Sequence, residues 1–410
     1  MEEKATKFSI HLVFSIFTFF VLLSSYIAYQ TNILGGDLYP LQMNYTQSYL
    51  RYLYLYLITN LTFYIIFMIL LKNKIKMKKS SFRKFLNFKF DESKTKQNYI
   101  HFLFLIINFF FLCTVSFTSL GTMIQGDNAP RLVELIYALL QPQYLVLLYI
   151  YYFADSKAYL YKINFIIFIF SIVLTGFTGY LLFFLPFIVH YLLKRIGMLR
   201  LIIFIIIGLP FLPLLRIYKH MLKYDITIHD MFERLDFAYI LKFARVMIDR
   251  FNYTQNMMFI SEKKAFFLEL FNDKADIYNP LYQGYLGSFF HKIIFHVPVG
   301  NIHAQLQYMI TGIADSNPFF PLFAYYLVDK DFGMIVLGYA IILSLLLYLI
   351  IESIQNNFYF EYLLFIILYL YLLGGGFWEL MNFFQALILF IFILFSIKIL
   401  MNKFKVEKYV

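Results

Sequence analysis

Uncharged apolar runs of about twenty residues recur along this chain and constrain its fold more than any other feature. A run of that length is what a helix needs to cross the hydrocarbon core of a bilayer. The runs are continuous and do not alternate with polar residues, so they predict helices and not the strands of a barrel. With 61% hydrophobic and 14% charged residues, the chain also lacks the polar surface of a soluble protein.

The sequence predicts an all-α polytopic integral membrane protein with about ten transmembrane helices. The first run has no small-residue cleavage site after it, so it is expected to be a retained span. The fifth and sixth runs are short and flank a turn at 176–179, which fits two thin or kinked spans or a re-entrant pair. The candidate spans are 8–29, 50–71, 99–121, 132–153, 160–176, 179–193, 201–217, 332–351, 361–376 and 380–398.

One long stretch, 218–331, contains no candidate span. It divides the chain into an N-terminal bundle (1–217), a large loop (218–331) and a C-terminal membrane segment (332–410). The loop holds 12 of the 24 acidic residues, 11 of the 35 Lys and Arg, and 5 of the 8 His. Most side chains able to do polar chemistry therefore lie in this loop.

The distribution of Lys and Arg predicts the orientation. Residues 72–98 carry ten basic residues against two acidic ones, which places this loop in the cytoplasm. The cytoplasmic segments then hold 21 basic and 8 acidic residues, against 14 and 16 on the opposite side. Both termini are expected in the cytoplasm and the large loop outside, where ATP is absent. The basic charge would face membrane lipids, so it does not indicate nucleic acid as a partner.

Arginines near the membrane surface are candidates for binding a lipid diphosphate. Arg216 ends the seventh candidate span, and Arg245 lies on a predicted amphipathic helix at 228–250 that ends at Arg250. The arginine side chain stays charged and forms bidentate hydrogen bonds with phosphate oxygens. The alternatives remain open: Arg216 as a membrane anchor, Arg245 facing headgroups, and Arg250 paired with Asp249.

Three histidines of the loop, His291, His296 and His303, match no zinc spacing, so no metal site is expected. His303 precedes an apolar stretch and is expected near the membrane. It is interpreted either as a general base or hydrogen-bond donor to a sugar, or as a structural histidine. No phosphate-binding or dinucleotide motif occurs, so no cofactor is expected.

The architecture and one short motif resemble the O-antigen or oligosaccharide repeat-unit polymerases (Wzy-type). The motif is Asp331-Phe332-Gly333, after the large loop, followed by a span that contains Gly338. Arg216 and Arg250 also lie where that family tends to place loop arginines. One departure concerns the turn 175–179, which reads Thr-Gly-Phe-Thr-Gly and lacks the arginine common in the family at this turn.

The resemblance implies a glycosyltransferase of multi-span (GT-C-like) fold in the bacterial inner membrane, independent of metal and of nucleotide sugars. It implies that undecaprenyl-diphosphate-linked oligosaccharide is the donor, that a second lipid-linked repeat unit is the acceptor, and that a chain-length regulator protein is a partner. The catalytic residues are then expected to be His303 as base and Arg250. Diphosphate binding is expected from Arg216, Arg245 and Lys292.

Two other functions remain open from the sequence. An O-antigen ligase has the same architecture and donor and differs only in its acceptor. A polysaccharide or lipid transporter (flippase) is a different class, which usually shows internal repeats, short loops and charges within spans. The chain shows one dominant loop and no internal repeat. The resemblance therefore favours the polymerase, and it leaves O-antigen, capsule and exopolysaccharide as open products.

Overall fold

The computed structural model describes residues 2–32, 46–72, 94–118, 120, 129–175, 182–208, 253–273, 320–354 and 357–406, and isolated positions between 283 and 309. Every regular element in these ranges is a helix, and none of these residues forms a strand. The expected all-α class is confirmed. The predicted amphipathic helix at 228–250 lies outside the described residues and stays a prediction.

Seven of the described helical segments are long and apolar enough to cross a membrane, and two shorter apolar ones accompany them. The expectation of a polytopic membrane protein is therefore confirmed. The seventh expected span, 201–217, overlaps the end of one long helix and otherwise lies outside the described residues. The long segments are α1 (Glu2–Thr31), α2 (Thr46–Lys72), α4 (Lys94–Phe117), α5 (Arg131–Leu140) with α6 (Pro142–Tyr152), α8 (Leu185–Gly208), α18 (Lys330–Ile354) and α20 (Phe377–Val406), and the shorter ones are α7 (Tyr159–Thr175) and α19 (Tyr359–Ile367) with the π-helix η5 (Leu368–Leu372).

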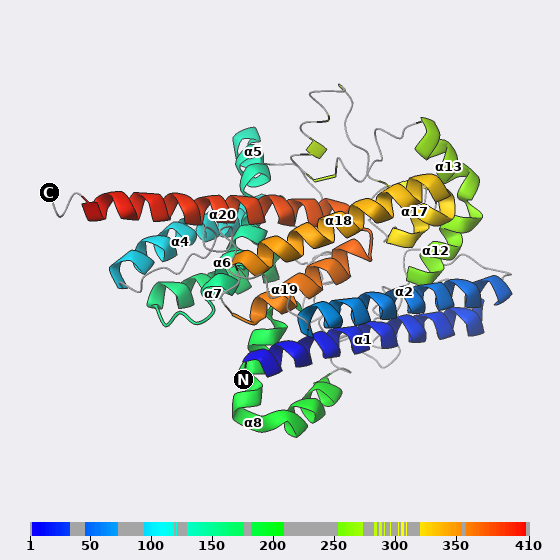
Figure 1. The fold of residues 1–410 in the computed structure, drawn as a ribbon, viewed down its shortest axis with the longest axis horizontal. Helices are drawn as coiled ribbons and strands as arrows, with labels where there is room; N and C mark the ends of the chain where they lie inside the picture. The colour runs from blue at the N-terminus through cyan, green and yellow to red at the C-terminus, as the bar shows by residue number, and fades with distance from the viewer. Residues whose placement is uncertain are drawn as a thin grey trace, which may run out of the picture.

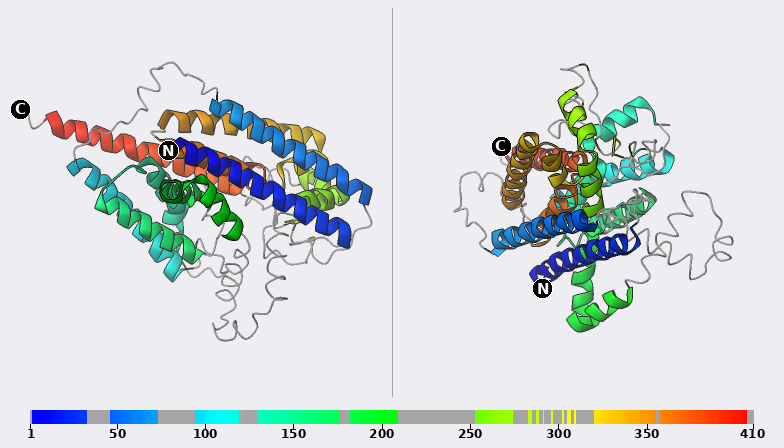
Figure 2. Two further views of the ribbon diagram at one scale, coloured as in Figure 1. Left: turned by 90° about the horizontal axis from the view of Figure 1, so that it is seen from below. Right: turned by 90° about the vertical axis from the view of Figure 1, so that its right-hand side faces the viewer.

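Helices α1, α2, α18 and α20 lie roughly along one axis, and the described helices of the large loop gather at one end of them (Figures 1 and 2). Helices α1 and α2 lie side by side, as both figures show. At the end where α1 stops and where α2 and α18 start lie α12 (Tyr253–Glu262), α13 (Lys264–Asp273) and α17 (Leu322–Val328). We call this the loop end of the bundle.

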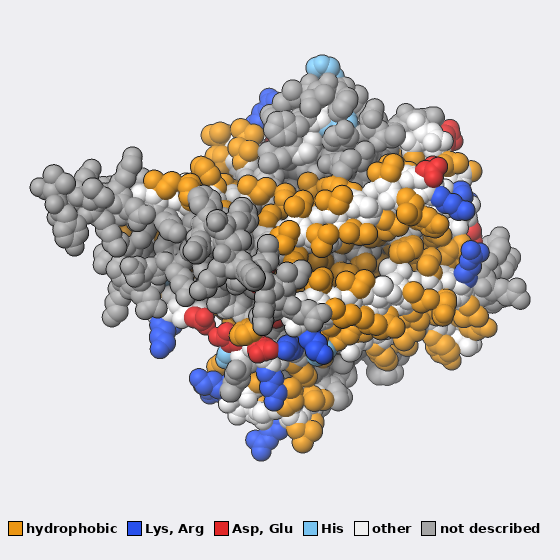
Figure 3. Space-filling model, in the orientation of Figure 1, with side chains coloured by type: hydrophobic (Ala, Val, Ile, Leu, Met, Phe, Trp, Pro, Cys, Tyr) orange, Lys and Arg blue, Asp and Glu red, His pale blue; other side chains and the backbone are white. Residues whose placement is uncertain are grey.

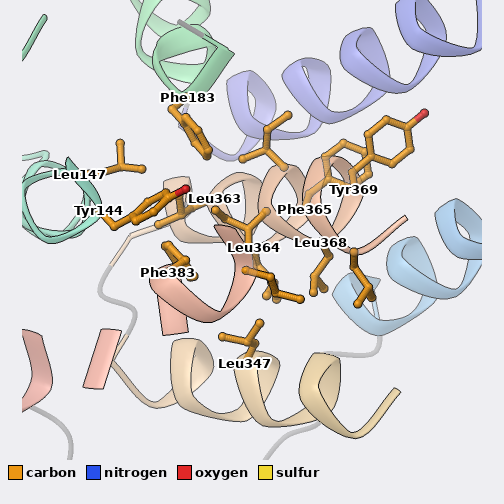
Figure 4. Packing of buried hydrophobic residues seen from close by; sticks show 14 of the residues in the cluster. Tyr144, Leu147, Phe183, Leu347, Leu363, Leu364, Phe365, Leu368, Tyr369 and Phe383 are labelled. Atoms are coloured by element: carbon orange, nitrogen blue, oxygen red, sulfur yellow. The ribbon is translucent and has the colours of Figure 1, made fainter. Parts of the chain in front are cut away.

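Two short helices form the centre of the bundle. All residues of α6 and of α19 are buried, which is expected for a helix that is hydrophobic on every side. Figure 4 shows Leu363, Leu364 and Leu368 of the α19–η5 helix packed among side chains from three other helices, including Tyr144 and Phe383. Because protein surrounds α19, it does not need the full length of a lipid-facing span.

The surface fits a bilayer. Hydrophobic side chains cover a broad band of the face in Figure 3, while charged ones gather at its right-hand edge and lower left. Large apolar residues are more than half exposed on α1, α2, α18 and α20, for example Phe19 (59%), Ile66 (53%), Ile335 (64%) and Phe392 (64%). A soluble monomer rarely exposes so much apolar area, so this band is the lipid-facing surface.

The structure differs from the sequence expectation at three of the expected spans. The span expected at 132–153 is two helices, because Gln141 takes a left-handed conformation (φ 45°, ψ 59°) just before Pro142. Figure 1 shows α5 at a steep angle to α20. Helix α8 contains most of the span expected at 179–193 and the described part, up to Gly208, of the span expected at 201–217, and it is kinked at Gly197 (φ 76°, ψ 171°). A single glycine can take that conformation, so the chain bends there without a loop.

Candidate functional site

The sequence-predicted site residues Arg216, Arg245, Arg250, Lys292 and His303 all lie outside the described residues, so their roles stay predictions. The described positions that flank His303 are informative. Ile302 is 2% exposed and Leu306 is fully buried, and both belong to the main hydrophobic core. This part of the large loop is therefore packed into the bundle and does not extend away from it.

His291 and His296, which precede His303 in the loop, differ in environment. His291 is buried, whereas His296 is exposed and has a positive φ of 58°. Among the described residues no three His, Cys, Asp or Glu side chains gather as metal ligands. Nothing in the described part of the chain therefore links these histidines to a metal.

A cluster of buried amide side chains lies where α5 meets α6. Because the chain breaks at Gln141, the last carbonyls of α5 have no helical partners. Gln385 of α20 donates to the carbonyl oxygens of Ala138 and Leu139, at 2.8 Å each, and Gln141 also donates to Ala138, at 3.0 Å. Gln143 donates to Oε1 of Gln141 at 3.2 Å. These bonds satisfy backbone groups that lipid cannot satisfy.

One acceptor of this cluster is left without a partner. Gln143 is 9% exposed, and its Oε1 atom makes no hydrogen bond, although its Nε2 atom does. Buried amides nearly always satisfy both ends, because an unfilled acceptor has lost its water and gained nothing in return. The unpaired Oε1 atom of Gln143 could therefore accept a hydrogen bond from a ligand or a bound water.

The first turns of α20 carry a second group of polar side chains. Glu379, Asn382 and Gln385 are spaced three residues apart, so they lie on one side of the helix. Phe383 on the same side packs edge-to-face against Tyr144 of α6, with ring centroids 5.9 Å apart. The stripe therefore faces the break between α5 and α6. We call Gln141, Gln143, Glu379, Asn382 and Gln385 together the corner site.

Glu379 is the charged member of the corner site. It is the third residue of α20, and its Oε2 atom lies 3.1 Å from the position that a Cβ on Gly376 would occupy. A glutamate at this helix position can reach back to the first turn. No described Lys or Arg forms an ion pair with it. An acidic side chain within a membrane helix is uncommon and usually functional.

Two tyrosines lie near Glu379 and the amide cluster. The Gly376 position beside Glu379 also lies 3.5 Å from the backbone of Tyr371. The hydroxyl of Tyr144 donates to the hydroxyl of Tyr371 at 3.3 Å, and Tyr144 is the neighbour of Gln143 along α6. The direct link between α20 and the amide cluster is Gln385, which follows Glu379 by less than two helical turns and bonds the last carbonyls of α5.

The large loop reaches the first turns of α20. A Cβ on Gly284 would lie 2.9 Å from Cβ of Met381 and 3.2 Å from Oδ1 of Asn382. Its φ of 86° is the left-handed region that glycine tolerates, and the preceding Gln283 is buried. The loop backbone at 283–284 therefore lies directly against the polar stripe of α20.

The motif that carries the family resemblance has a structural role in this chain. Asp329 accepts a hydrogen bond from the backbone N–H of Phe332 at 2.9 Å, so it caps the start of α18. Phe332 packs against Phe271 of α13, with ring centroids 5.0 Å apart. Gly333 allows α17 to approach α18, whereas Gly338 has no atom close to its missing Cβ.

Sequence reasoning missed the corner site. A signal was present: Gln141-Pro142-Gln143 interrupts an apolar run, and polar residues follow at three-residue steps from Glu379. This pattern is weaker than the concentration of charged residues in the large loop, because it consists of a few polar residues within apolar spans. Comparison with known proteins adds no identity, because no family model, no curated protein and no solved structure matches this chain.

Proposed function

We propose that this protein is a polymerase of lipid-linked oligosaccharide repeat units. The observation that best supports the proposal is the contact of the loop segment 283–284 with Met381 and Asn382. It brings the chain segment with most of the polar residues onto a polar, partly buried stripe at the loop end of the bundle. A membrane enzyme for a glycan on a lipid carrier needs both features in one place.

The proposed reaction uses the site residues predicted from the sequence. The acceptor hydroxyl attacks the anomeric carbon of the donor glycan, the bond from that carbon to the diphosphate oxygen breaks, and the lipid diphosphate leaves. His303 would take the proton from the hydroxyl, and Arg250 would stabilise the charge that develops on the leaving oxygen. Arg216, Arg245 and Lys292 would hold the diphosphate.

The setting is part of the same proposal. The excess of Lys and Arg on one side supports an orientation with both termini in the cytoplasm and the loop end on the outer face. The membrane in this proposal is the bacterial inner membrane, which the family resemblance implies. Undecaprenyl-diphosphate-linked repeat units are available on that face without ATP or nucleotide sugars. A chain-length regulator protein would act there as a partner.

A transporter is the second candidate, and specific observations favour it. The chain breaks a helix at Gln141, kinks another at Gly197 and contains the π-helix η5. Discontinuous helices near polar residues are typical of transporter binding sites, and π-helices are frequent at functional sites in general. A ligase also fits, because it shares the donor and differs in the acceptor.

Deletion of the gene in its host separates these functions. A polymerase defect leaves a lipid core that carries one repeat unit, without the ladder of longer chains on a silver-stained gel. A ligase defect leaves a bare core while polymer accumulates on the lipid carrier. A transporter defect leaves unpolymerised repeat units on the cytoplasmic face, and an unchanged surface glycan contradicts all three functions.

Complementation then tests the residues. Arg216→Ala, Arg250→Ala and His303→Ala are expected to abolish elongation at normal protein level. Full elongation by all three single variants would show that the proposed catalytic residues are wrong, even if the deletion identifies a polymerase.

A further inference from the structure

We propose that the corner site binds a neutral sugar ring of the lipid-linked acceptor. The site consists of Gln141, Gln143, Glu379, Asn382 and Gln385, none of which the sequence analysis assigned to substrate binding. This inference rests on the proposed function, because it names a place for the sugar that accepts the growing glycan.

The orphan acceptor of Gln143 is the first argument. Its Oε1 atom is buried without a partner beside a left-handed break between two helices. The group that completes it must donate a hydrogen bond, and a sugar hydroxyl is such a donor. The other end of this amide is fixed as the donor, because it lies 3.2 Å from the acceptor oxygen Oε1 of Gln141.

The mixture of polar groups at the α5–α6 break and on the first turns of α20 is the second argument. Amides both donate and accept, a carboxylate accepts, and the two phenols of Tyr144 and Tyr371 do either. Sugar rings present hydroxyls on neighbouring carbons that also do both. A purely apolar lipid chain would leave these polar groups unsatisfied, so the corner site matches the sugar end of a lipid-linked substrate and not its tail.

The sign of the charge is the third argument. Glu379 has no ion-pair partner among the described residues, and no described Lys or Arg belongs to the corner site. A phosphate or a uronic acid bound there would therefore be buried without a described cation to pair with it, which is costly. The site therefore selects a neutral ring, and the diphosphate must be held elsewhere, by the arginines proposed above.

The chain contains its own reporter for a binding test. Trp378, which directly precedes Glu379, is the only tryptophan in the sequence. Its fluorescence in the purified full-length protein can be titrated with the neutral sugars glucose, galactose, rhamnose and N-acetylglucosamine, with the repeat-unit oligosaccharide released from the host's surface glycan, and with glucuronate. We expect a saturable change with the released oligosaccharide or at least one neutral sugar, and none with glucuronate at the same concentration.

Matched variants locate the site. Gln143→Leu is expected to weaken sugar binding about tenfold, the effect of losing one hydrogen bond in a buried site. Asn60→Leu removes another buried amide with an orphan oxygen, on α2 and outside the corner site, and it is expected to leave binding unchanged. If Gln143→Leu fails to fold, Glu379→Gln provides the test, because it replaces one acceptor oxygen of the corner site by a donor and should weaken sugar binding, whereas Asn60→Leu should not.

The outcomes separate this inference from the proposed function. An absent fluorescence response, an equal response to glucuronate, or an equal loss in Gln143→Leu and Asn60→Leu would overturn the corner site. Such a result, together with loss of elongation in the gene deletion, would leave the polymerase intact. Specific sugar binding in a protein whose deletion does not alter glycan length would support the corner site and refute the polymerase.

Discussion

Gly333 of α18 faces the backbone of Tyr326 of α17 with no space for a side chain. A Cβ on Gly333 would lie 2.3 Å from Cα and 2.5 Å from the backbone nitrogen of Tyr326. Because backbone atoms cannot move aside as a flexible side chain can, the glycine sets how closely α17 and α18 pack. The third position of the Asp331-Phe332-Gly333 motif is therefore explained by packing at the loop end.

Gly333→Ala is predicted to destabilise the protein by about 1 to 3 kcal/mol, because overpacking forces two helices apart. The matched control is Gly338→Ala, in the same helix, where nothing lies within 4 Å of the missing Cβ. That variant should be neutral or gain up to about 1 kcal/mol from helix propensity. Thermal unfolding can be followed through the reaction of Cys113, the only cysteine, with a thiol-reactive dye. Equal midpoints for the two variants would contradict this packing.

Gly375→Ala is predicted to prevent folding. The φ of Gly375 is 75°, and a Cβ there would lie 1.8 Å from the carbonyl oxygen of Phe320, so conformational strain and a backbone collision act together. Gly197 has nearly the same φ, 76°, but no atom within 4 Å of its missing Cβ. Gly197→Ala should therefore fold and lose only about 1 to 3 kcal/mol. The yield of monodisperse protein in size-exclusion chromatography distinguishes them, and a well-folded Gly375→Ala variant would contradict the predicted collision.

The hydroxyl of Tyr52 in α2 donates a hydrogen bond to the hydroxyl oxygen of Ser261 in α12 at 2.6 Å. This bond joins the large loop to the transmembrane bundle. A double-mutant cycle with Tyr52→Phe and Ser261→Ala should give a coupling energy of about 0.6 kcal/mol, the average for hydrogen bonds between membrane helices. The same cycle with Tyr52→Phe and Ser344→Ala serves as control, because Ser344 bonds only to the carbonyl of Ala340 in its own helix. A coupling indistinguishable from that of the control would show that this contact does not hold α12.

The sequence predicted the helical class and most spans because apolar runs identify membrane helices directly. It could not predict that Gln141 breaks a span, since Gln carries no strong turn signal and the break depends on Gln385 supplying hydrogen bonds from a distant helix. The sequence also could not predict that α12 packs inside the bundle. Thr254, Gln255 and Asn256 read as exposed and polar, yet all three are buried, and Gln255 donates to Ser24 of α1 at 2.9 Å.

The candidate site shows the same limit. The concentration of charged residues predicted a site in the large loop, but the residues predicted for that site lie outside the described residues. The corner site depends on long-range juxtaposition, because Gln143 and Glu379 are separated by more than two hundred residues in the chain. Only the packing of α20 against α6 brings their neighbourhoods together, and no local pattern encodes that packing.

The orientation from the Lys and Arg bias predicts which described loops face outward. Lys264 begins α13 in the large loop, Lys157 lies between α6 and α7, and both are exposed. In a Cys113→Ala background, Lys264→Cys should react with a membrane-impermeant maleimide in spheroplasts. Lys157→Cys should react only after lysis, because the excess of basic residues keeps its side of the membrane in the cytoplasm. The reverse labelling pattern would place the large loop in the cytoplasm, away from any outward-facing lipid-linked glycan, and would therefore refute the proposed polymerase.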